Sequence, residues 1–358
     1  MKKALITIGV ILLLIIIVSV GYFWVSIGKP LYKPGMVRDG ENLTAPLTPP
    51  EQSGDSSFWD VETGIKLHHF NDGVGTRVLV IHGGPGYPFE SPLPGLHLLS
   101  SKYEFIYYDQ RGCGKSVKLF DKFESPNYYA NMTQLESTLG IGAQVADIER
   151  IRQILGEEKL IILGHSFGGF LAALYAAEFP ERIQAMILNA PASVLVFPDE
   201  ENSLFSLVKS KLPQDMHKEY GAFMQRYFDF GSIFQKSEAE LAALNREFGK
   251  FYLMASNADS AMIQAATDSA ENGGWMVQAM YFSMGKKHDY RDALKNVSAP
   301  VLVIHGSNDL QPETASRTYS AILPNATLQV LDNAGHFGFN DQPEAFADLV
   351  DKFLSELK

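Results

Sequence analysis

Short apolar runs rich in β-branched residues alternate along most of this chain with stretches of helical periodicity. The runs are TRVLVIHGG at 76–84, YEFIYYDQRG at 103–112, KLIILGHS at 159–166, IQAMILNAP at 183–191, APVLVIHGSND at 299–309 and ATLQVLDNAGH at 326–336. Most of these runs are continuously apolar in their centre, which is typical of strands that are buried on both faces. We therefore predict an α/β fold with a mostly parallel central sheet.

The segments between these runs carry the spacing of amphipathic helices. In residues 141–155, apolar side chains recur from Val145 and Ile148 onward at intervals of three, and residues 168–179 and 343–357 are also predicted helices. Such helices cover the two faces of a parallel sheet. Strand and helix thus alternate as in an open α/β domain.

One long segment interrupts this alternation. Residues 193–289 are polar, aromatic and helical in character, and they fall between two predicted strands. We expect residues 58–192 and 290–358 to form the α/β core and residues 193–289 to form a helical cap over the strand ends, where ligands bind in such sheets. A separate domain unrelated to the site is the alternative.

The N-terminal residues point to a membrane. After Lys2 and Lys3, the uncharged run from Ala4 to Ile27 would span roughly 36 Å as a helix, enough for a bilayer core of about 30 Å. We expect residues 1–28 to be a single-pass anchor, with the rest of the chain outside the cytoplasm. Cleavage as an export signal, which would make the protein secreted, is the alternative. Residues 29–57, rich in Pro and Gly, are interpreted as a linker.

Composition excludes several other classes of function. The formal net charge is −11 and no Lys/Arg-rich run is present, so no nucleic-acid partner is expected. Cys113 is the only cysteine, which rules out an intrachain disulfide and a multi-cysteine zinc site. Nothing near it in sequence offers a base, so a structural cysteine is expected. No metal cluster or dinucleotide loop occurs, and no cofactor is implied.

The candidate nucleophile is Ser166. It is the centre of a G-x-S-x-G motif, Gly164 to Gly168, between a predicted strand and a predicted helix. A sharp strand-to-helix turn pushes the central side chain out at the sheet edge, and the flanking glycines avoid clashes with neighbouring backbone.

A serine nucleophile needs a base and an orienting carboxylate, and on this fold the chain order is Ser, acid, His. Asp309 follows the strand at 299–309, and His336 follows the strand at 326–336. Asp332 and Asp341 are rival acids, but both flank His336 too closely in sequence. The rival histidines, His82, His165 and His305, are less well placed. We therefore predict the triad Ser166, Asp309 and His336.

The reaction also needs donors for an oxyanion. One is expected to be the backbone N–H of Phe167, directly after the nucleophile. The other should come from the glycine loop HGGPG at 82–86, with the N–H of Gly84 as the choice and Gly83, also a candidate for substrate contact, as the alternative.

Four motifs together resemble the proline iminopeptidase (prolyl aminopeptidase) family of α/β-hydrolase-fold serine peptidases. They are HGGPG at 82–86, YYDQRGCGKS at 107–116, DIERIR at 147–152 and GHSFGG at 164–169. The resemblance covers residues 58–192 and 299–358, and the cap only weakly. It implies release of an N-terminal residue, typically proline, from small peptides.

The resemblance also implies that acidic residues, partly from the cap, bind the free amino group of the substrate. Glu240 resembles one such position, whereas a second falls near Met280, which is not acidic. Asp109 and Arg111 are expected to form a structural ion pair that braces their loop.

Three functions are thus compatible with the sequence. The first is an aminopeptidase that acts on short peptides through an acyl-enzyme on Ser166. The second is an esterase or amidase that acts on small acyl substrates, and the third is a non-catalytic binding protein. An epoxide hydrolase or haloalkane dehalogenase is disfavoured because those enzymes carry Asp at the position of Ser166.

Overall fold

The computed structural model describes residues 28–198, 203–258, 260–269 and 271–357, and its centre is an eight-stranded sheet. The strands, in spatial order, are β1 (Phe58–Glu62), β2 (Ile65–Gly73), β4 (Tyr103–Tyr108), β3 (Thr76–Ile81), β5 (Leu160–His165), β6 (Ile183–Asn189), β9 (Val301–Gly306) and β10 (Ala326–Leu331). Every pair from β4 to β10 is parallel, whereas the β1–β2 and β2–β4 pairs are antiparallel. The prediction of a mostly parallel sheet is confirmed.

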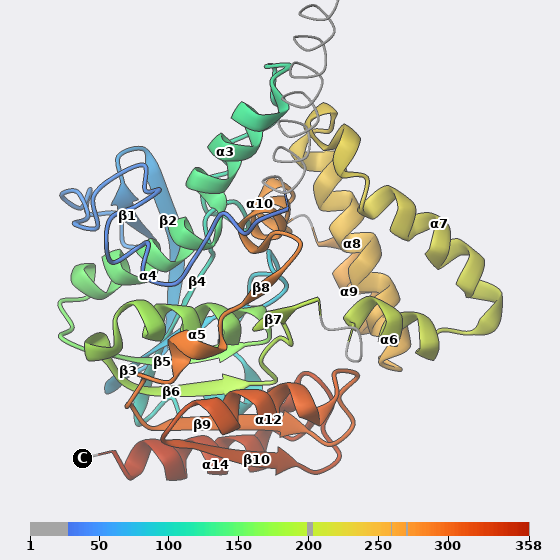
Figure 1. The fold of residues 1–358 in the computed structure, drawn as a ribbon. Coiled ribbons are helices and arrows are strands. Elements are labelled where there is room, and N and C mark those ends of the chain that lie inside the picture. The colour runs from blue at the N-terminus through green and yellow to red at the C-terminus, as the bar shows by residue number, and fades with distance from the viewer. Residues whose placement is uncertain (1–27, 199–202, 259, 270, 358) are drawn as a thin grey trace, which may run out of the picture.

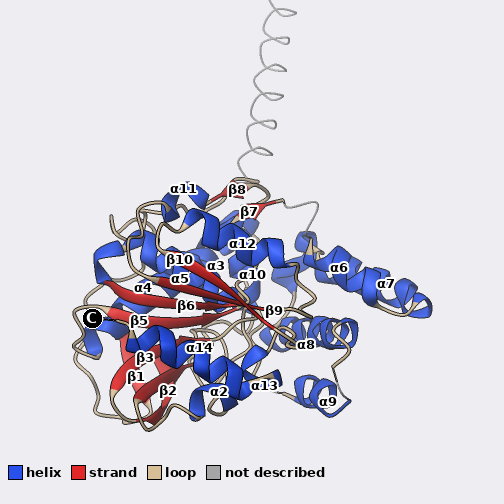
Figure 2. Cartoon of the chain, turned by 90° about the horizontal axis from the view of Figure 1, so that it is seen from below, coloured by secondary structure: helices blue, strands red, loops and turns tan. Residues whose placement is uncertain are grey.

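The helices cover both faces of this sheet (Figures 1 and 2). One face carries α4 (Ile141–Ile154), α5 (Phe167–Glu178), α11 (Arg291–Leu294) and α12 (Glu313–Ile322), and the other carries α2 (Pro94–His97), α13 (Gly338–Asp341) and α14 (Pro343–Ser355). A single turn, η1 (Pro180–Arg182), joins α5 to β6. Side chains of β3 alternate between two apolar cores, Leu79 toward the α5 face and Val80 toward the α14 face.

The insertion between β6 and β9 forms a helical layer beyond the strand ends (Figures 1 and 2). Its elements are β7 (Val196–Phe197), α6 (Leu204–Lys211), η2 (Gln214–Met216), α7 (His217–Tyr227), η3 (Phe230–Gln235), α8 (Glu238–Ala255), α9 (Ser260–Asp268), α10 (Trp275–Met284) and β8 (His288–Asp289). β7 and β8 pair antiparallel where the chain leaves and re-enters the core. The last cap helix, α10, packs against α3 (Tyr128–Leu139), which precedes α4.

Residues 28–57 differ from the linker interpretation. They form turns, but Tyr32 and Val37 are fully buried. The Tyr32 hydroxyl donates to Glu178 of α5 at 2.9 Å, and Arg150 of α4 donates to the Pro46 carbonyl. This segment is therefore packed against the domain because its aromatic and aliphatic side chains cover the outer surface of α4 and α5.

The expected membrane anchor, residues 1–28, lies outside the described residues apart from Gly28, and it stays a prediction. In the part of the chain that the structure describes, no helix has the length and hydrophobicity to cross a bilayer.

Candidate active site

Ser166 occupies the sharp turn between β5 and α5. Its backbone has φ 54° and ψ −120°, a conformation that L residues rarely adopt. A Cβ on Gly164 would lie 2.5 Å from the Gly168 carbonyl oxygen, and one on Gly168 would lie 2.2 Å from that of Ile81. Both glycines are therefore required by close backbone approach. The turn has the geometry expected of a nucleophile at the edge of the sheet.

His336 and Asp309 form a buried hydrogen-bonded pair. The His336 Nδ1 lies 2.9 Å from Asp309 Oδ2, and the backbone N–H of Gln311 donates to Asp309 Oδ1 at 2.9 Å. The two residues lie in the turns after β10 and β9. We assign the Nδ1 proton to this bond, which leaves Nε2 of His336 unprotonated and available as a base.

The His165 ring contacts the His336 ring, so the His336–Asp309 pair lies next to the turn that carries Ser166. The two ring centroids lie 4.8 Å apart, and His165 directly precedes Ser166. The structure therefore brings the three predicted triad residues to one end of the sheet.

The glycine loop lies against the nucleophile. A Cβ on Gly83 would lie 2.8 Å from the Ser166 Cβ, and Gly84 has a positive φ of 111°. The Phe167 N–H belongs to the first turn of α5, where backbone N–H groups have no acceptor within the helix. Both predicted oxyanion donors thus come from segments that border Ser166.

The other histidines of the site serve as structural groups. His82 Nδ1 bonds the Gly83 carbonyl at 3.0 Å, and its Nε2 accepts from the Gln110 N–H at 3.1 Å. Burial lowers the pKa of His82 to about 4, so the ring is neutral at physiological pH. Burial also lowers the pKa of His165, which contacts Asn189 at 3.0 Å, and of His305, which contacts Ser316 at 3.0 Å. Each of these rings already has a hydrogen-bond partner within the protein.

The structure corrects the prediction for Glu240. Its carboxylate accepts from the backbone N–H of Ser237 at 2.7 Å, and the Ser237 hydroxyl accepts from the Glu240 N–H. The pair is the capping box at the start of α8, on the solvent-exposed end of that helix. In the structure Glu240 is therefore an exposed helix-capping residue.

The expected ion pair between Asp109 and Arg111 is also wrong. Arg111 is fully buried and bonds Asp147 and Glu62, whereas Asp109 bonds His68 at 3.1 Å. The Arg111 side chain thus reaches α4 and β1, whereas the Asp109 side chain reaches β2.

Cys113 is buried, and its thiol donates to the Gln110 carbonyl at 3.2 Å. Burial raises the pKa of this thiol, so the expected structural role fits. Among the described residues, no group of three or more His, Cys, Asp or Glu side chains is arranged to hold a metal ion.

Sequence reasoning missed the cap residues that cover the site. The Tyr252 ring, from α8, packs edge-on against the His336 ring with a centroid distance of 5.5 Å. Asn245 of the same helix has its carbonyl bonded by the Tyr87 hydroxyl. The only signal in the sequence is the helical spacing of Asn245, Gly249 and Tyr252, which places them on one face of α8.

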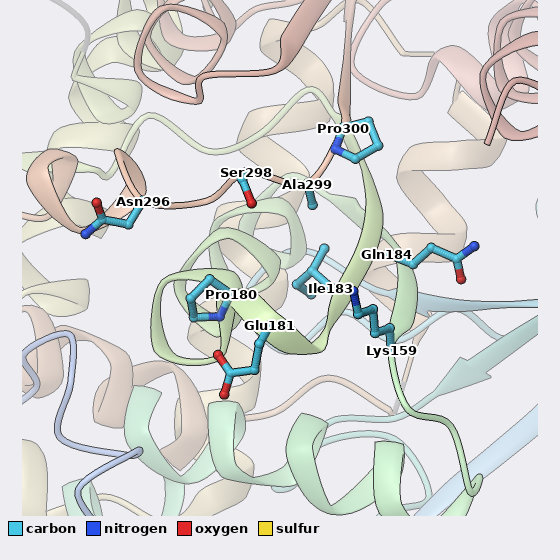
Figure 3. A pocket seen from close by; sticks show the side chains of 9 residues that line it. All are labelled: Lys159, Pro180, Glu181, Ile183, Gln184, Asn296, Ser298, Ala299 and Pro300. Carbon is cyan, nitrogen blue, oxygen red and sulfur yellow. The ribbon is translucent and has the colours of Figure 1, made fainter. Parts of the chain in front are cut away.

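A shallow hollow of about 570 Å³ lies at the opposite end of the sheet (Figure 3). Its lining includes Lys159, Ile183 and Pro300, which stand at the starts of β5, β6 and β9. Ser166 follows the other end of β5, so this hollow is not part of the candidate site.

Comparison with known proteins agrees with this geometry. Residues 76–343 match the family model described as alpha/beta hydrolase fold. A proline iminopeptidase of Heyndrickxia coagulans is 27% identical over 84% of this chain and 98% of its own length. Two solved structures share the fold. The first is a proline iminopeptidase of Mycobacterium smegmatis, with a TM-score of 0.55 and 18% identity, and the match covers 86% of this chain and 97% of that chain. The second is an esterase of Thermogutta terrifontis, with a TM-score of 0.53 and 20% identity, and the match covers 82% of this chain and 94% of that chain.

These matches confirm the resemblance to the proline iminopeptidases that the four motifs indicated. Together with the family model, which spans most of the chain, they show that the protein belongs to the α/β-hydrolase family.

Proposed function

We propose that this protein is a serine hydrolase that cleaves an amide or ester bond of a small substrate through an acyl-enzyme on Ser166. The observation that carries the proposal is the strained Ser166 elbow beside the buried His336–Asp309 pair. Pure binding requires neither the strained serine nor the oriented histidine.

The mechanism follows from these positions. Nε2 of His336 takes the proton of the Ser166 hydroxyl as its oxygen attacks the substrate carbonyl, and Asp309 stabilises the imidazolium that forms. The N–H groups of Phe167 and Gly84 donate to the oxyanion. His336 then protonates the leaving group, and a water molecule activated by the same ring releases the acyl group from Ser166.

The finer proposal is an aminopeptidase that removes proline or another small N-terminal residue from short peptides. Support comes from relatives named proline iminopeptidase that align over nearly their whole length. The second candidate is an esterase or amidase for other small acyl substrates. The observation that favours it is the engagement of Glu240 in a helix cap, which leaves the free amino group of a peptide without that partner.

The hydrolase proposal is tested by labelling with a fluorophosphonate probe, which reacts with activated serines whatever the natural substrate. We expect labelling of Ser166 alone, and we expect Ser166→Ala to abolish it and to lower kcat for any turned-over amide or ester by roughly 10⁴-fold or more. Ser320→Ala, at a partly exposed position of α12, is the matched control and should behave as the wild type. Undiminished labelling or turnover in Ser166→Ala would show that another group is the nucleophile.

A further inference from the structure

In the described part of the chain, three rings contact the ring of His336, and they come from different parts of the fold. The rings of His165 and Phe337 belong to the core, and their centroids lie 4.8 and 5.4 Å from that of His336. The third ring is that of Tyr252 from the cap helix α8, at 5.5 Å and an interplanar angle of 66°. Core and cap thus hold His336 between them, and of these three contacts only the one with Tyr252 depends on where the cap lies.

The side chain of Tyr252 also faces the partner of that histidine. Tyr252 is only 9% exposed, and its hydroxyl lies within electrostatic range of the Asp309 carboxylate. Burial and, after it, the negative charge of Asp309 hold the pKa of Tyr252 well above its usual range, so the hydroxyl stays neutral. The side chain of Ser256, one helical turn further on, hydrogen-bonds this hydroxyl and donates to the Tyr252 carbonyl at 2.9 Å. Tyr252 is therefore held with its ring against His336 and its hydroxyl toward Asp309.

The helix that carries Tyr252 is also tied to the glycine loop. Tyr87 directly follows this loop, and its hydroxyl donates to the Asn245 carbonyl of α8. A Cβ on Gly249 would lie 2.6 Å from the same hydroxyl, so the backbone of α8 lies directly against Tyr87. Asn245, Gly249 and Tyr252 share one face of the helix. This face therefore contacts both the neighbour of the glycine loop and the candidate base.

A firmly held ring matters for a base of this kind. The hydrogen bond to Asp309 keeps the proton on Nδ1 of His336 and leaves Nε2 as the base, and both side chains are almost inaccessible to solvent. Such a hydrogen bond is stronger where water is excluded, and a ring whose rotation is blocked by packing stays in one orientation. From the side of the cap, Tyr252 provides this packing.

We propose that Tyr252 is a positioning residue that holds the His336–Asp309 pair in place, so that the base is competent only while α8 lies against the core. The proposal rests on the acyl-enzyme chemistry at Ser166, to which it adds a group that acts through His336. The ring of Tyr252 supplies the contact, so phenylalanine should be able to replace it. The cap thereby contributes to catalysis as well as covering the site.

The first test is the proton NMR spectrum of the full chain without substrate. The Nδ1 proton that His336 shares with Asp309 is expected to give a signal far downfield, and His336→Gln identifies this signal by removing it. We expect Tyr252→Ala to remove or broaden the signal, because water then reaches the hydrogen bond and the proton exchanges faster. Tyr252→Phe should retain it. A purely structural role of Tyr252 within the cap would leave the signal unchanged.

The second test is the turnover of proline 4-nitroanilide or, where this amide is not cleaved, of 4-nitrophenyl acetate. Tyr252→Ala should lower kcat about 10- to 100-fold with a much smaller change in KM, because a correctly oriented base is needed in the transition state. Tyr252→Phe should keep most of the wild-type kcat. Tyr220→Ala is the matched control, since it removes a buried ring of α7 that packs on Phe223 and Phe251. It should leave kcat and the NMR signal near their wild-type values.

Fluorophosphonate labelling of the wild type separates this proposal from the proposed function. Absence of labelling would overturn the serine hydrolase itself. Labelling of the wild type, together with an NMR signal and a kcat that Tyr252→Ala leaves unchanged, would overturn the positioning role alone. A raised KM at unchanged kcat, which marks a substrate contact, or equal losses in Tyr220→Ala, which mark a general loosening of the cap, would overturn it as well. Tyr252→Leu, which keeps apolar volume without the aromatic ring, takes the place of Tyr252→Ala where that variant does not fold.

Discussion

His82 acts on the site through the backbone that it holds. Its ring is fully buried, and its two nitrogens join the Gly83 carbonyl to the Gln110 N–H. Gly83 in turn borders Ser166. The ring fixes the glycine loop only in its neutral form, because protonation would leave Nε2 unable to accept from Gln110.

This arrangement predicts that stability depends on pH through His82. An unfolded histidine titrates near 6.5, and the pKa of His82 in the fold is about 4. The contribution is therefore complete above pH 6.5. This contribution to the free energy of unfolding is lost as the pH falls toward 4, because His82 takes up a proton in the unfolded chain at a pH where it stays neutral in the fold. The loss amounts to roughly 3 kcal/mol. Urea unfolding at pH 8 and at pH 4.5 measures this change in the free energy of unfolding.

The comparison uses His82→Gln and, as control, His97→Gln, whose side chain is 64% exposed. His82→Gln should be less stable than the wild type at pH 8 but should lose less stability on acidification. His97→Gln should follow the wild-type change. Equal losses in wild type and His82→Gln would show that His82 does not carry the effect.

The candidate triad could be predicted from residues alone because its signals are local. A glycine-flanked serine after an apolar run, and an acid and a histidine in the turns after later runs, are each visible within a few residues. The error at Glu240 was also avoidable, since Ser237 and Glu240 have the S-x-x-E spacing of a capping box. The contact of Tyr252 with His336 was not predictable, because it depends on how α8 lies over the core.

Between elements, a buried ion network joins the loop after β4 to α4 and β1. Arg111 bonds Asp147 and Glu62, and Arg150 also bonds Asp147 at 3.1 Å. Arg111 and Asp147 are almost completely buried. The loop that carries Arg111 also contacts the cap, since a Cβ on Gly112 would lie 2.9 Å from the Met276 Cβ. The network thus holds in place the loop on which the cap helix α10 packs.

We expect Arg111→Met to lower the free energy of unfolding by about 3–5 kcal/mol, because it leaves buried carboxylates without a full partner. Arg291→Met removes an ion pair with Asp289 that is about half exposed on both sides, and it should cost less than about 1 kcal/mol. Denaturant unfolding at neutral pH measures both. A cost for Arg111→Met no larger than that of the control would mean that the network does not stabilise the fold.

The elements missed by sequence reasoning share a physical cause. The β1–β2 hairpin and α3 carry many polar residues, and their apolar faces are completed by distant segments. β2 pairs antiparallel with β4, and α3 packs against α10 from the far side of the insertion. By contrast, β3, β4, β5, β6 and β9 are largely buried on both faces, and their continuous hydrophobicity identifies them without knowledge of their neighbours.

Across the whole molecule, residues 28–50 connect the cap to the core, and we call them the N-terminal strap. The Tyr32 N–H donates to the Ser283 carbonyl of α10 at 3.1 Å, while its hydroxyl and the N–H groups of Gly35 and Arg38 reach the buried Glu178 of α5. The linker interpretation failed here because Pro and Gly mark turns but do not reveal whether those turns are packed.

The strap should therefore be required for stability. A chain that begins at residue 52 loses the buried Tyr32 and Val37 and removes all three donors from Glu178. We expect it to be at least about 3 kcal/mol less stable than a chain that begins at residue 28, since a buried carboxylate loses its hydrogen bonds and apolar surface is exposed. Because α10 contacts the strap through Ser283 and the glycine loop through Met276, the shorter chain should also label more slowly with a fluorophosphonate. Denaturant unfolding and labelling rates of the two chains provide the measurement, with Tyr32→Phe as a graded control that should cost only about 1 kcal/mol. Equal unfolding midpoints and equal labelling rates for the two chains would show that residues 28–50 do not stabilise the domain and act only as a linker.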